Sequence, residues 1–340
     1  KLDFTKGNLI MSNVILMTGV GSYLPKNKYS NQDLTKFIDT SDEWITKRSG
    51  IKSRHFVSKN ELTSDLAVNA ALKAIKTANL NIQDIDLIIV ATTTPDNSFP
   101  STATKVQQKL GIKGIAFDVQ AVCAGFVFAL SVACSMMKDN HSKNCLVIGA
   151  DSMSKLLNWK DRATSVLFGD GAGAVVLQKE DNKDNNLNDW GILSNVIHSD
   201  GRYYDLLKTS GGVSFNQKIG SIEMVGKEVF KHAVEKLCSS FDQALKLSNK
   251  NINQIDWLVP HQANQRILIA VSDRLKIESS KVISTVEKHG NTSAASIPLA
   301  LDDAFSSNKI KNGNLLGFQA IGGGLSWGSA IVRFGRPENN

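Results

Sequence analysis

Three side chains in this sequence combine reactive groups with positions at expected strand-to-helix turns. The first, Cys123, lies between a strand-like run and an apolar helical segment at residues 124–137. A cysteine at the first turn of a helix meets unpaired backbone N–H groups and the positive end of the helix dipole, which favour the thiolate. Cys123 is therefore a candidate nucleophile. Free cysteines are more often buried and inert, which is how we interpret Cys134, Cys145 and Cys238.

His261 and Asn291 are candidates for binding a developing negative charge. They lie in the segments VPHQAN (residues 259–264) and HGNTSAAS (residues 289–296), again at expected turns. His261 directly follows a strand, at the carboxyl end where open α/β sheets place ligands. Imidazole and carboxamide N–H groups that converge on one oxygen stabilise an oxyanion or enolate by about 3–4 kcal/mol each. The other histidines are interpreted as packing or surface residues: His55, His141, His198, His232 and His289.

Two glycine clusters differ in what they can do. The cluster GDGAG at residues 169–173 looks like a dinucleotide-binding fingerprint, but it precedes a strand and opens no helix, so it predicts no phosphate cradle. The glycine triplet at residues 322–324 stands between two expected strands, at residues 315–320 and 329–334. Such a turn can present a bare backbone N–H to a substrate. A tight hairpin without a functional role explains the triplet equally well.

The elements that position these residues form a repeated pattern. Apolar runs of strand length alternate with helical patterns, which predicts a layered α/β fold. Residues 79–90 (NLNIQDIDLIIV) and 249–260 (NKNINQIDWLVP) match at five of twelve positions, and each copy follows a helix and enters a strand. A strand, a turn and an apolar helix come next in both places. A duplicated fold is expected to put Cys123 and Asn291 at equivalent turns, brought together by a pseudo-twofold axis.

Composition narrows the class of protein. Of the 340 residues, 42% are hydrophobic and 21% are charged, which excludes disorder, collagen and coiled coil as the main architecture. No apolar run approaches the roughly 20 residues that a membrane span needs. The four cysteines lack C-x-x-C spacing and no secretory leader is recognised, which predicts a cytoplasmic protein without disulfides or a zinc site. Residues 1–10, before Met11, are interpreted as a leader or an added segment.

The charge of the chain suggests an acidic or phosphorylated partner, although a basic surface without a functional role explains it equally well. The net charge is +7 and the isoelectric point is near 9.1. Nucleic acid is not the predicted partner, because no dense Lys/Arg tract or aromatic platform is found. Thr40 and Glu43 are expected to form a capping box for a short helix, on which Trp44 and Arg48 share one face. Indole and guanidinium suit an aromatic base and a phosphate, although an ordinary surface contact is equally compatible.

Several long motifs, in order, resemble the β-ketoacyl-acyl-carrier-protein synthase III family, the initiating condensing enzymes of type II fatty-acid synthesis in the thiolase superfamily. The resemblance runs from about residue 14 to residue 334. Its motifs are SDEWI (41–45), RSGI (48–51), residues 118–130 around the cysteine, GDGAG (169–173), PHQAN (260–264), HGNTSAAS (289–296) and residues 322–329. It implies a thiolase-like, five-layered α-β-α-β-α fold of two duplicated halves, residues 11–185 with Cys123 and residues 186–340 with His261 and Asn291.

The resemblance also implies a reaction and the role of each residue in it. Cys123 accepts the acyl group from acyl-CoA, with acetyl-CoA as the expected starter, while the backbone N–H groups of Cys123 and Gly323 hold the thioester oxyanion. His261 and Asn291 hold the thioester oxygen of malonyl-acyl-carrier protein while carbon dioxide leaves. The carbanion then attacks the acyl-cysteine. This decarboxylative Claisen condensation needs no metal or redox cofactor, and the family implies a homodimer.

Other matched positions imply binding contacts. Trp44 and Arg162 match positions that sandwich the adenine of coenzyme A, and Arg48 matches a position near its pantetheine and phosphate path. Phe99 matches a residue that reaches the acyl pocket of the partner subunit. Positions matched to binding of the acidic carrier protein are Lys231, Arg266 and Arg274.

The chain departs from the family pattern at two positions. Asp273 stands beside Arg274 where relatives often have two cations, which affects the expected carrier-protein contacts. Ile321 precedes the glycine triplet where an aromatic residue is frequent, so the acyl pocket is expected to differ in size.

Three other interpretations stay open from the sequence. A paralogue with the same three residues could condense a different starter or act in secondary metabolism. A papain-like thiol hydrolase has the same order of cysteine, histidine and asparagine, but the apolar helix after Cys123 and the missing protease signature disfavour it. A non-catalytic binding protein is disfavoured because all three reactive residues are present.

Overall fold

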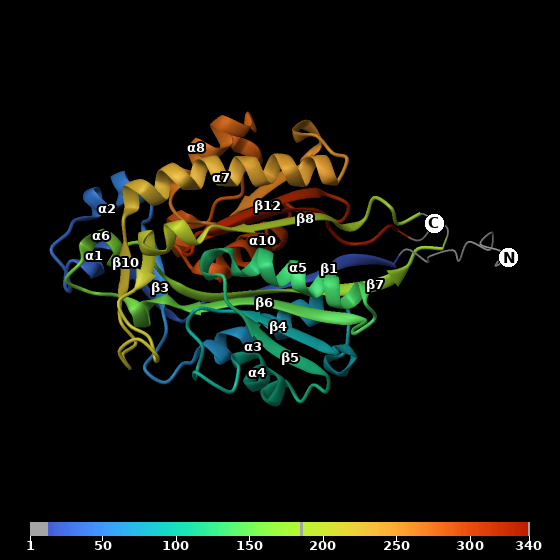
Figure 1. Cartoon of the computed structure of the whole chain (residues 1–340), viewed down its shortest axis with the longest axis horizontal. Coiled ribbons are helices and arrows are strands. Elements are labelled where there is room, and N and C mark those ends of the chain that lie inside the picture. Colours follow the sequence, from blue (N-terminus) through green and yellow to red (C-terminus); the bar gives the residue numbers. More distant parts are fainter. Residues whose placement is uncertain (1–12, 184–185, 339–340) are drawn as a thin grey trace.

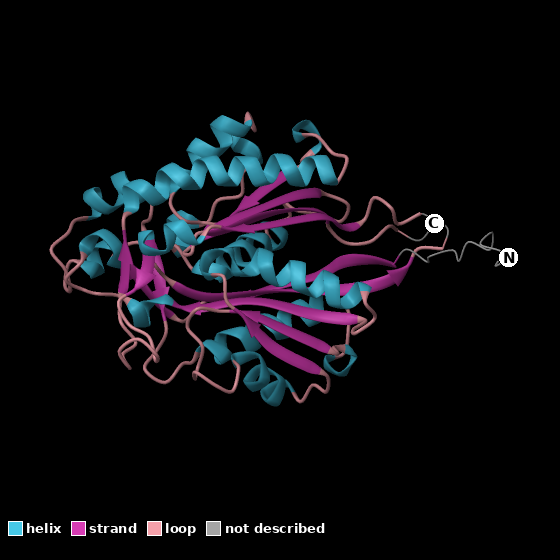
Figure 2. Ribbon diagram, viewed as in Figure 1, coloured by secondary structure: helices cyan, strands magenta, loops and turns pink. Residues whose placement is uncertain are grey.

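Two β-sheets and three layers of helices are stacked in the order α-β-α-β-α (Figure 1, Figure 2). The computed structural model describes residues 13–183 and 186–338. The segment interpreted as a leader, residues 1–10, lies outside the described residues. The layering is the one implied by the family resemblance, and it encloses one layer of helices between the two sheets.

The first sheet has five strands in the order β1-β7-β6-β4-β5. Strand β4 pairs in parallel with β5 and β6, whereas β7 is antiparallel to β6 and to β1. Helices α3 and α4 cover its outer face, at the bottom of Figure 1. The bounds are β1 (Asn13–Tyr23), β4 (Leu87–Ala91), β5 (Ile115–Val119), β6 (Asn144–Ser152), β7 (Asp170–Asp181), α3 (Thr63–Thr77) and α4 (Thr102–Leu110).

The second sheet repeats this arrangement in the order β11-β12-β13-β8, with β11 parallel to β12 and the other pairs antiparallel. A single bridge between Leu258 and Val282 stands where the first sheet has β5. Helices α7 and α8 cover the outer face, at the top of Figure 1. The bounds are β8 (Gly191–Ser199), β11 (Trp257–Pro260), β12 (Leu315–Gly322), β13 (Ser326–Arg333), α7 (Gly226–Leu247) and α8 (Gln265–Leu275).

The middle layer consists of α5 (Gly125–Lys138) and α10 (Ser296–Ser306). As its composition predicted, α5 is buried on most of its surface, and its apolar side chains belong to the large core between the two sheets. Helix α10 packs closely on β7, because a Cβ atom on Gly173 would lie 2.6 Å from the backbone N of Leu299. The GDGAG cluster therefore serves packing inside β7, and the prediction that it opens no helix is confirmed.

The internal repeat is confirmed in detail. Asn79 and Asn249, which follow α3 and α7, both adopt a left-handed φ, of 55° and 54°. The matched aspartates also make the same kind of contact, because both accept backbone N–H groups. Asp86 accepts hydrogen bonds from the backbone N–H groups of Lys143 and Asn144 as β6 begins, and Asp256 accepts one from the N–H of Leu315, the first residue of β12. Each aspartate thus ties its own strand to the start of the neighbouring strand.

Shorter elements surround the ends of the sheets. The strand pairs are β2 (Asn27–Ser30) with β3 (Ser53–Phe56), and β9 (Leu207–Thr209) with β10 (Ile222–Met224). The short helices are α1 (Asn31–Leu34), α2 (Asp42–Ser49), α6 (Arg162–Ser165) and α9 (Val286–His289). In Figure 1, α1, α2 and α6 gather at one end of the molecule, away from the two chain termini.

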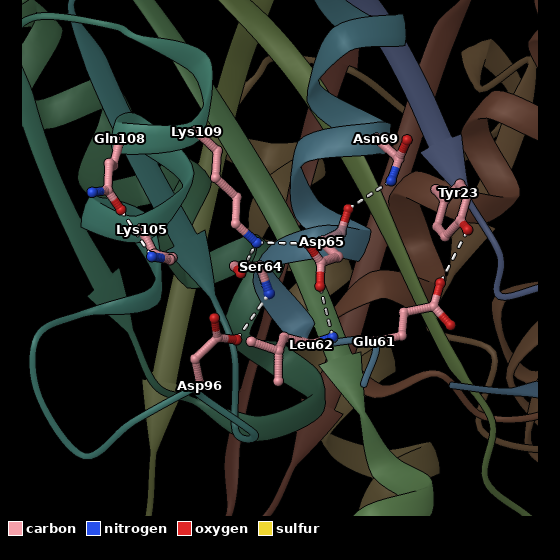
Figure 3. A network of polar contacts seen from close by, with 10 residues as sticks. All are labelled: Tyr23, Glu61, Leu62, Ser64, Asp65, Asn69, Asp96, Lys105, Gln108 and Lys109. Carbon is pink, nitrogen blue, oxygen red and sulfur yellow. Dashed lines mark hydrogen bonds and ion pairs between the residues drawn. The ribbon is translucent and has the colours of Figure 1, made fainter. Parts of the chain in front are cut away.

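A polar network fastens the outer helices of the first sheet at the N-terminal end of α3 (Figure 3). Asp65 accepts from the backbone N–H of Leu62 and pairs with Lys109 of α4, whose ammonium group also reaches the Ser64 hydroxyl. The backbone N–H of Ser64 donates a hydrogen bond to Asp96, which lies in the loop after β4. This loop carries Phe99, so the network anchors the segment on which Phe99 stands.

Candidate active site

Cys123 lies in the turn between β5 and α5. The chain makes one turn of 3₁₀-helix at Val122–Ala124 before α5 begins at Gly125, and Val122 adopts a left-handed φ of 49°. Cys123 therefore precedes the α-helix, whereas the sequence predicted it in the first helical turn. Its side chain is buried.

Cys123 lines a cavity of about 930 Å³. The buried residues of its wall are apolar and come from separate segments, among them Met153, Leu156, Phe168 and Ile222. Exposed apolar side chains, Tyr204, Val213 and Phe215, also border it. An apolar cavity beside a thiol suits an acyl chain. Sequence reasoning missed these wall residues because they share no motif or periodicity.

The glycine turn after β12 packs against the backbone of Cys123. A Cβ atom on Gly322 would lie 2.6 Å from the backbone N of Cys123, so no larger residue fits there without a shift. Gly323 lines the same cavity as Cys123. The structure thus brings together the two residues whose N–H groups are expected to hold the thioester oxyanion.

The thiol of Cys123 is strongly desolvated. Burial raises the pKa of this thiol to about 12 and outweighs the lowering by the neighbouring Ser293 hydroxyl. The prediction of a lowered thiol pKa is therefore wrong. The physical reason is that burial removes most of the water that would solvate the thiolate, while the N–H groups of α5 begin two residues further along the chain.

His261 follows β11 directly, as predicted, and is buried. Its Nδ1 lies 2.6 Å from the Oγ of Ser296, the first residue of α10. That oxygen accepts the backbone N–H of Gln262 at 3.3 Å, so we assign its own hydrogen to Nδ1. The imidazole proton then sits on Nε2. Burial lowers the pKa of His261 to about 3, so the ring is a neutral N–H donor at physiological pH.

Asn291 is fixed by both its backbone and its side chain. Its N–H donates to the carbonyl of Leu167 and its carbonyl accepts the N–H of Gly169, each at 2.9 Å. Its Oδ1 accepts the backbone N–H of Ser293 at 2.9 Å. This bond occupies Oδ1, so the Nδ2 amide hydrogens are the part of the carboxamide left to donate to another group. Ser293 and Ser296 were missed as orienting residues, although both stand in the HGNTSAAS motif that singled out Asn291.

The turns that carry the three reactive residues are linked to one another. The Cys123 turn packs on the 3₁₀ turn Ser293–Ala295, which follows Asn291 and leads into Ser296, the partner of His261. Among the described residues that line the Cys123 cavity, neither His261 nor Asn291 is found. Asn291 stands two residues before a left-handed residue, Ser293, whereas Cys123 stands one residue after Val122. The sequence predicted equivalent positions for Cys123 and Asn291, and this prediction is wrong. In the register set by Val122 and Ser293, the two residues are three positions apart.

Trp44, Arg48 and Arg162 form one cluster. The guanidinium carbons of Arg48 and Arg162 lie 4.3 and 5.0 Å from the centroid of the indole. Helix α2 begins at Asp42 with Ser41 as its N-cap, so the predicted capping box with Thr40 is wrong. Gly50 ends the helix in the left-handed conformation. The cluster offers two cations and an aromatic face at one site.

Phe99 and Ile321, both expected near acyl pockets, lie in different surroundings. Phe99 is 85% exposed, so its ring is available to another subunit. Ile321 does not line the Cys123 cavity, and its side chain is buried in the core beneath α7 and α8. The reason is the alternation of β12, in which Leu316, Phe318 and Ala320 face the middle layer. The expectation that Ile321 sets the size of this cavity is not supported by its position.

The residues expected to bind carrier protein lie on the outer helix layer. Lys231 is on α7, and Arg266, Asp273 and Arg274 are on α8, all with exposed side chains. The two helices pack on each other. The described residues contain no helix long and apolar enough to cross a membrane. They also contain no group of three or more His, Cys, Asp or Glu side chains placed to hold a metal ion.

Comparison with known proteins places this site in a family. Residues 117–201 match the model for 3-oxoacyl-[acyl-carrier-protein (ACP)] synthase III, and residues 245–334 match the model for its C-terminal part. The beta-ketoacyl-[acyl-carrier-protein] synthase III of Paramagnetospirillum magneticum is 52% identical over 326 residues, which are 96% of this chain and 99% of that protein. The chain belongs to the β-ketoacyl-acyl-carrier-protein synthase III family. Family membership confirms the resemblance and makes the protein an acyl-transferring condensing enzyme of fatty-acid biosynthesis.

Solved structures agree with this assignment. The 3-oxoacyl-[acyl-carrier-protein] synthase III of Aquifex aeolicus superposes with a TM-score of 0.87 at 42% identity, covering 94% of this chain and all of that one. The priming β-ketosynthase of the R1128 polyketide pathway superposes with a TM-score of 0.87 at 32% identity, covering 96% and 97%. The thiolase-like fold predicted from the sequence is confirmed. A papain-like hydrolase and a non-catalytic binding protein do not fit membership of this synthase family.

Proposed function

We propose that the protein condenses an acyl-CoA starter, with acetyl-CoA as the expected one, with malonyl-acyl-carrier protein through an acyl-Cys123 intermediate. The observation that carries this proposal is the position of Cys123 in an apolar cavity, with Gly322 packed on its backbone and Gly323 beside it. In the first half-reaction, Sγ forms a bond to the acyl carbon and the bond from that carbon to the sulfur of coenzyme A breaks. Coenzyme A leaves as the thiol with the proton of Cys123. The N–H groups of Cys123 and Gly323 hold the oxyanion.

The second half-reaction uses His261 and Asn291 as neutral donors. The bond between the malonyl methylene and its carboxylate breaks, carbon dioxide leaves, and the electron pair moves onto the thioester as an enolate. Nε2–H of His261 and Nδ2–H of Asn291 are the groups left free for that oxygen by Ser296 and Ser293. The enolate carbon then bonds to the acyl carbon, Sγ leaves as the thiolate, and one proton taken up from solvent restores the thiol. No electron is gained or lost overall, so we propose that no redox cofactor is required.

Binding of the two substrates follows the distribution of charge and aromatic rings. We propose that adenine stacks against Trp44 between Arg48 and Arg162, since the two cations already flank the ring. Lys231, Arg266 and Arg274 are proposed to meet the acidic carrier protein on α7 and α8. Asp273 weakens this surface locally, because its carboxylate repels an acidic partner.

We also propose a cytoplasmic homodimer. Strand β5 is the edge of the first sheet and its residues are only partly buried, with Ile115 40% exposed. An open edge of this kind pairs readily with a second strand. Phe99 is exposed, and we propose that it reaches the acyl pocket of a second subunit. Light scattering of the purified protein should give a mass near twice 36.9 kDa, and a monomer at micromolar concentration would contradict the proposal.

The deciding experiment for the activity is intact-mass spectrometry after incubation with a panel of acyl-CoA thioesters, followed by peptide mapping. We expect an acetyl adduct on Cys123, and none on the Cys123→Ala variant, which should also lose condensation. A preference for a longer or branched chain would keep the mechanism and favour the second candidate function, a condensing enzyme of secondary metabolism. The observation behind this second candidate is the similarity to the R1128 priming ketosynthase. If no thioester labels folded protein at Cys123, the proposal fails.

A further inference from the structure

Arg54 of β3 is a fully buried cation with neutral hydrogen-bond partners. Its exposure is 0%, and in the described part of the chain no carboxylate lies within ion-pair distance of it. Nη1 donates to Oδ1 of Asn31 at 2.7 Å and Nη2 donates to the carbonyl of Val166 at 2.8 Å, while Nε is buried without a partner. Burial lowers its pKa to about 10, so the group stays charged at neutral pH. Burying a guanidinium without a carboxylate partner costs free energy of folding. Its presence here therefore indicates a role that needs the two-pronged donor geometry of the guanidinium.

One arm of the fork holds the chain next to Asn291. The Val166 carbonyl belongs to the residue just before Leu167, and Leu167 and Gly169 supply both backbone hydrogen bonds of Asn291. The side chain of Arg54 also lies beneath this junction, because a Cβ atom on Gly169 would stand 3.1 Å from the Cβ of Arg54. A shift of the guanidinium would therefore move the backbone on which Asn291 is mounted.

The other arm reaches the helix that carries Trp44 and Arg48. Nδ2 of Asn31 donates to Oδ1 of Asp42 and to the carbonyl of Ile51, each at 2.7 Å. Asp42 is the first residue of α2, and Ile51 follows the Gly50 that ends it. Asn31 thus grips both ends of α2, and Arg54 holds Asn31.

We propose that Arg54 is a positioning residue that fixes the Asn291 carboxamide and helix α2 in one frame through the two arms of its guanidinium. Its importance for the reaction rests on the proposed function, in which Asn291 holds the enolate and α2 binds coenzyme A. The geometric part of the proposal, the hold on the Asn291 backbone, stands independently of the substrates.

The Arg54→Lys variant keeps the charge but offers one compact head group in place of a fork, so it cannot hold Asn31 and Val166 together. We expect malonyl decarboxylation and condensation to fall about 10- to 100-fold, with acylation of Cys123 at saturating acyl-CoA kept within about threefold. The matched control is Arg333→Lys at the far end of β13, where Arg333 binds Asp189 and the Gly313 carbonyl through the same kind of fork. The control should leave the ratio of the two half-reactions unchanged. A purely structural role for Arg54 would lower both half-reactions alike.

Hydrogen exchange provides a readout without substrate. In Arg54→Lys, we expect the N–H groups of Asn291 and Gly169 to exchange about tenfold or more faster, since the turn at 166–169 loses its anchor at the Val166 carbonyl, while β6 amides stay protected. If both this exchange and the half-reaction ratio match the wild type, the proposal is overturned. Should wild-type Cys123 accept no acyl group, the proposed function fails, and the exchange result alone still decides whether Arg54 positions Asn291.

A second variant covers the case in which Arg54→Lys does not fold. Asn31→Ser removes the hold on α2 but leaves the bond from Arg54 to Val166. We expect the KM for acyl-CoA to rise about three- to tenfold, with malonyl decarboxylation and Asn291 exchange near wild type. A fall in decarboxylation with an unchanged KM would contradict the assignment of the two arms.

Discussion

The two halves of the molecule use the same turns but carry different reactive residues. The repeat that matches Asp86 with Asp256 also matches Ala91 with His261. Further along, the left-handed residues Val122 and Ser293 are equivalent. Aligning them matches Cys123 with Ala294. Cys123 and His261 thus each have an alanine as the counterpart in the other half. The alanines are close together in space, because a Cβ atom on Gly125 would lie 3.1 Å from the Cβ of Ala91 and 3.3 Å from that of Ala294.

This difference shows how a duplicated fold produces one site. The backbone builds a turn at the same place twice, and a single side chain decides whether that copy supplies a nucleophile or a donor. The small counterparts keep the space between the two turns narrow, so that the turns can pack on each other. Asn291 departs from this pattern, since its counterpart in this register is Gln120, a second carboxamide, which lines the Cys123 cavity.

The largest expected effect comes from removing the donor side chains of the second half. His261→Ala, and separately Asn291→Ala, remove a donor to the enolate oxygen. We expect malonyl decarboxylation to fall about 10²- to 10³-fold and acylation of Cys123 to change less than about threefold. Radiolabelled carbon dioxide release and intact mass measure the two half-reactions. Equal losses in both would contradict the division of labour between the halves.

The protonation state of His261 gives a related test. Burial lowers the pKa of His261 to about 3, from an ordinary value of 6.5, so the neutral ring is favoured in the folded enzyme. The stability that this neutral ring contributes is present above pH 6.5 and is lost as the pH falls through the folded pKa. Between about pH 5.5 and 8, the decarboxylation rate should therefore show no inflection from this residue. The measurement is a pH profile of decarboxylation by the wild type. A rise on acidification with a midpoint near 6.5 would mean that the imidazolium is the active donor.

The thiol of the first half should behave as a buried thiol rather than as a helix-activated one. With its pKa raised to about 12, the thiolate fraction of Cys123 grows with pH across the accessible range. We expect the rate of alkylation by iodoacetamide to rise about tenfold per pH unit between pH 6 and 9. Peptide mapping separates Cys123 from the other cysteines, and Cys123→Ala is the control. A plateau below pH 8 would show that the N–H groups of α5 outweigh burial.

Much of the fold and part of the site follow from the sequence, for physical reasons. Local patterns predicted the layered fold, the repeat and the turns of Cys123 and His261, because helix and strand periods and small-residue turns are set by neighbouring residues. The thiol pKa was predicted with the wrong sign, because desolvation depends on segments distant in sequence that enclose the side chain only in the folded chain. Arg54 gave no signal, since a lone arginine in a strand looks like a surface residue until the fold encloses it.

The smallest expected effect compares the matched aspartates. Asp86 uses both carboxylate oxygens, one for Asn144 N–H and the Ser142 hydroxyl and the other for Lys143 N–H. Asp256 uses one oxygen, for the backbone N–H of Leu315 at 2.7 Å and the Asn314 amide at 3.3 Å. An asparagine keeps a single acceptor oxygen, so Asp256→Asn can retain its bonds, whereas Asp86→Asn must turn an NH₂ group toward a backbone N–H or a hydroxyl.

We therefore expect Asp86→Asn to lower the free energy of unfolding by about 2 kcal/mol and Asp256→Asn by about 1 kcal/mol or less. Urea denaturation at one fixed protein concentration measures both, since association would otherwise shift the midpoints. Acylation of Cys123 in native buffer should be unchanged in both variants, as neither aspartate lies at the site. Equal losses would show that the two copies share this contact in energy as well as in position, and a larger loss for Asp256→Asn would reverse the ranking that the hydrogen bonds predict.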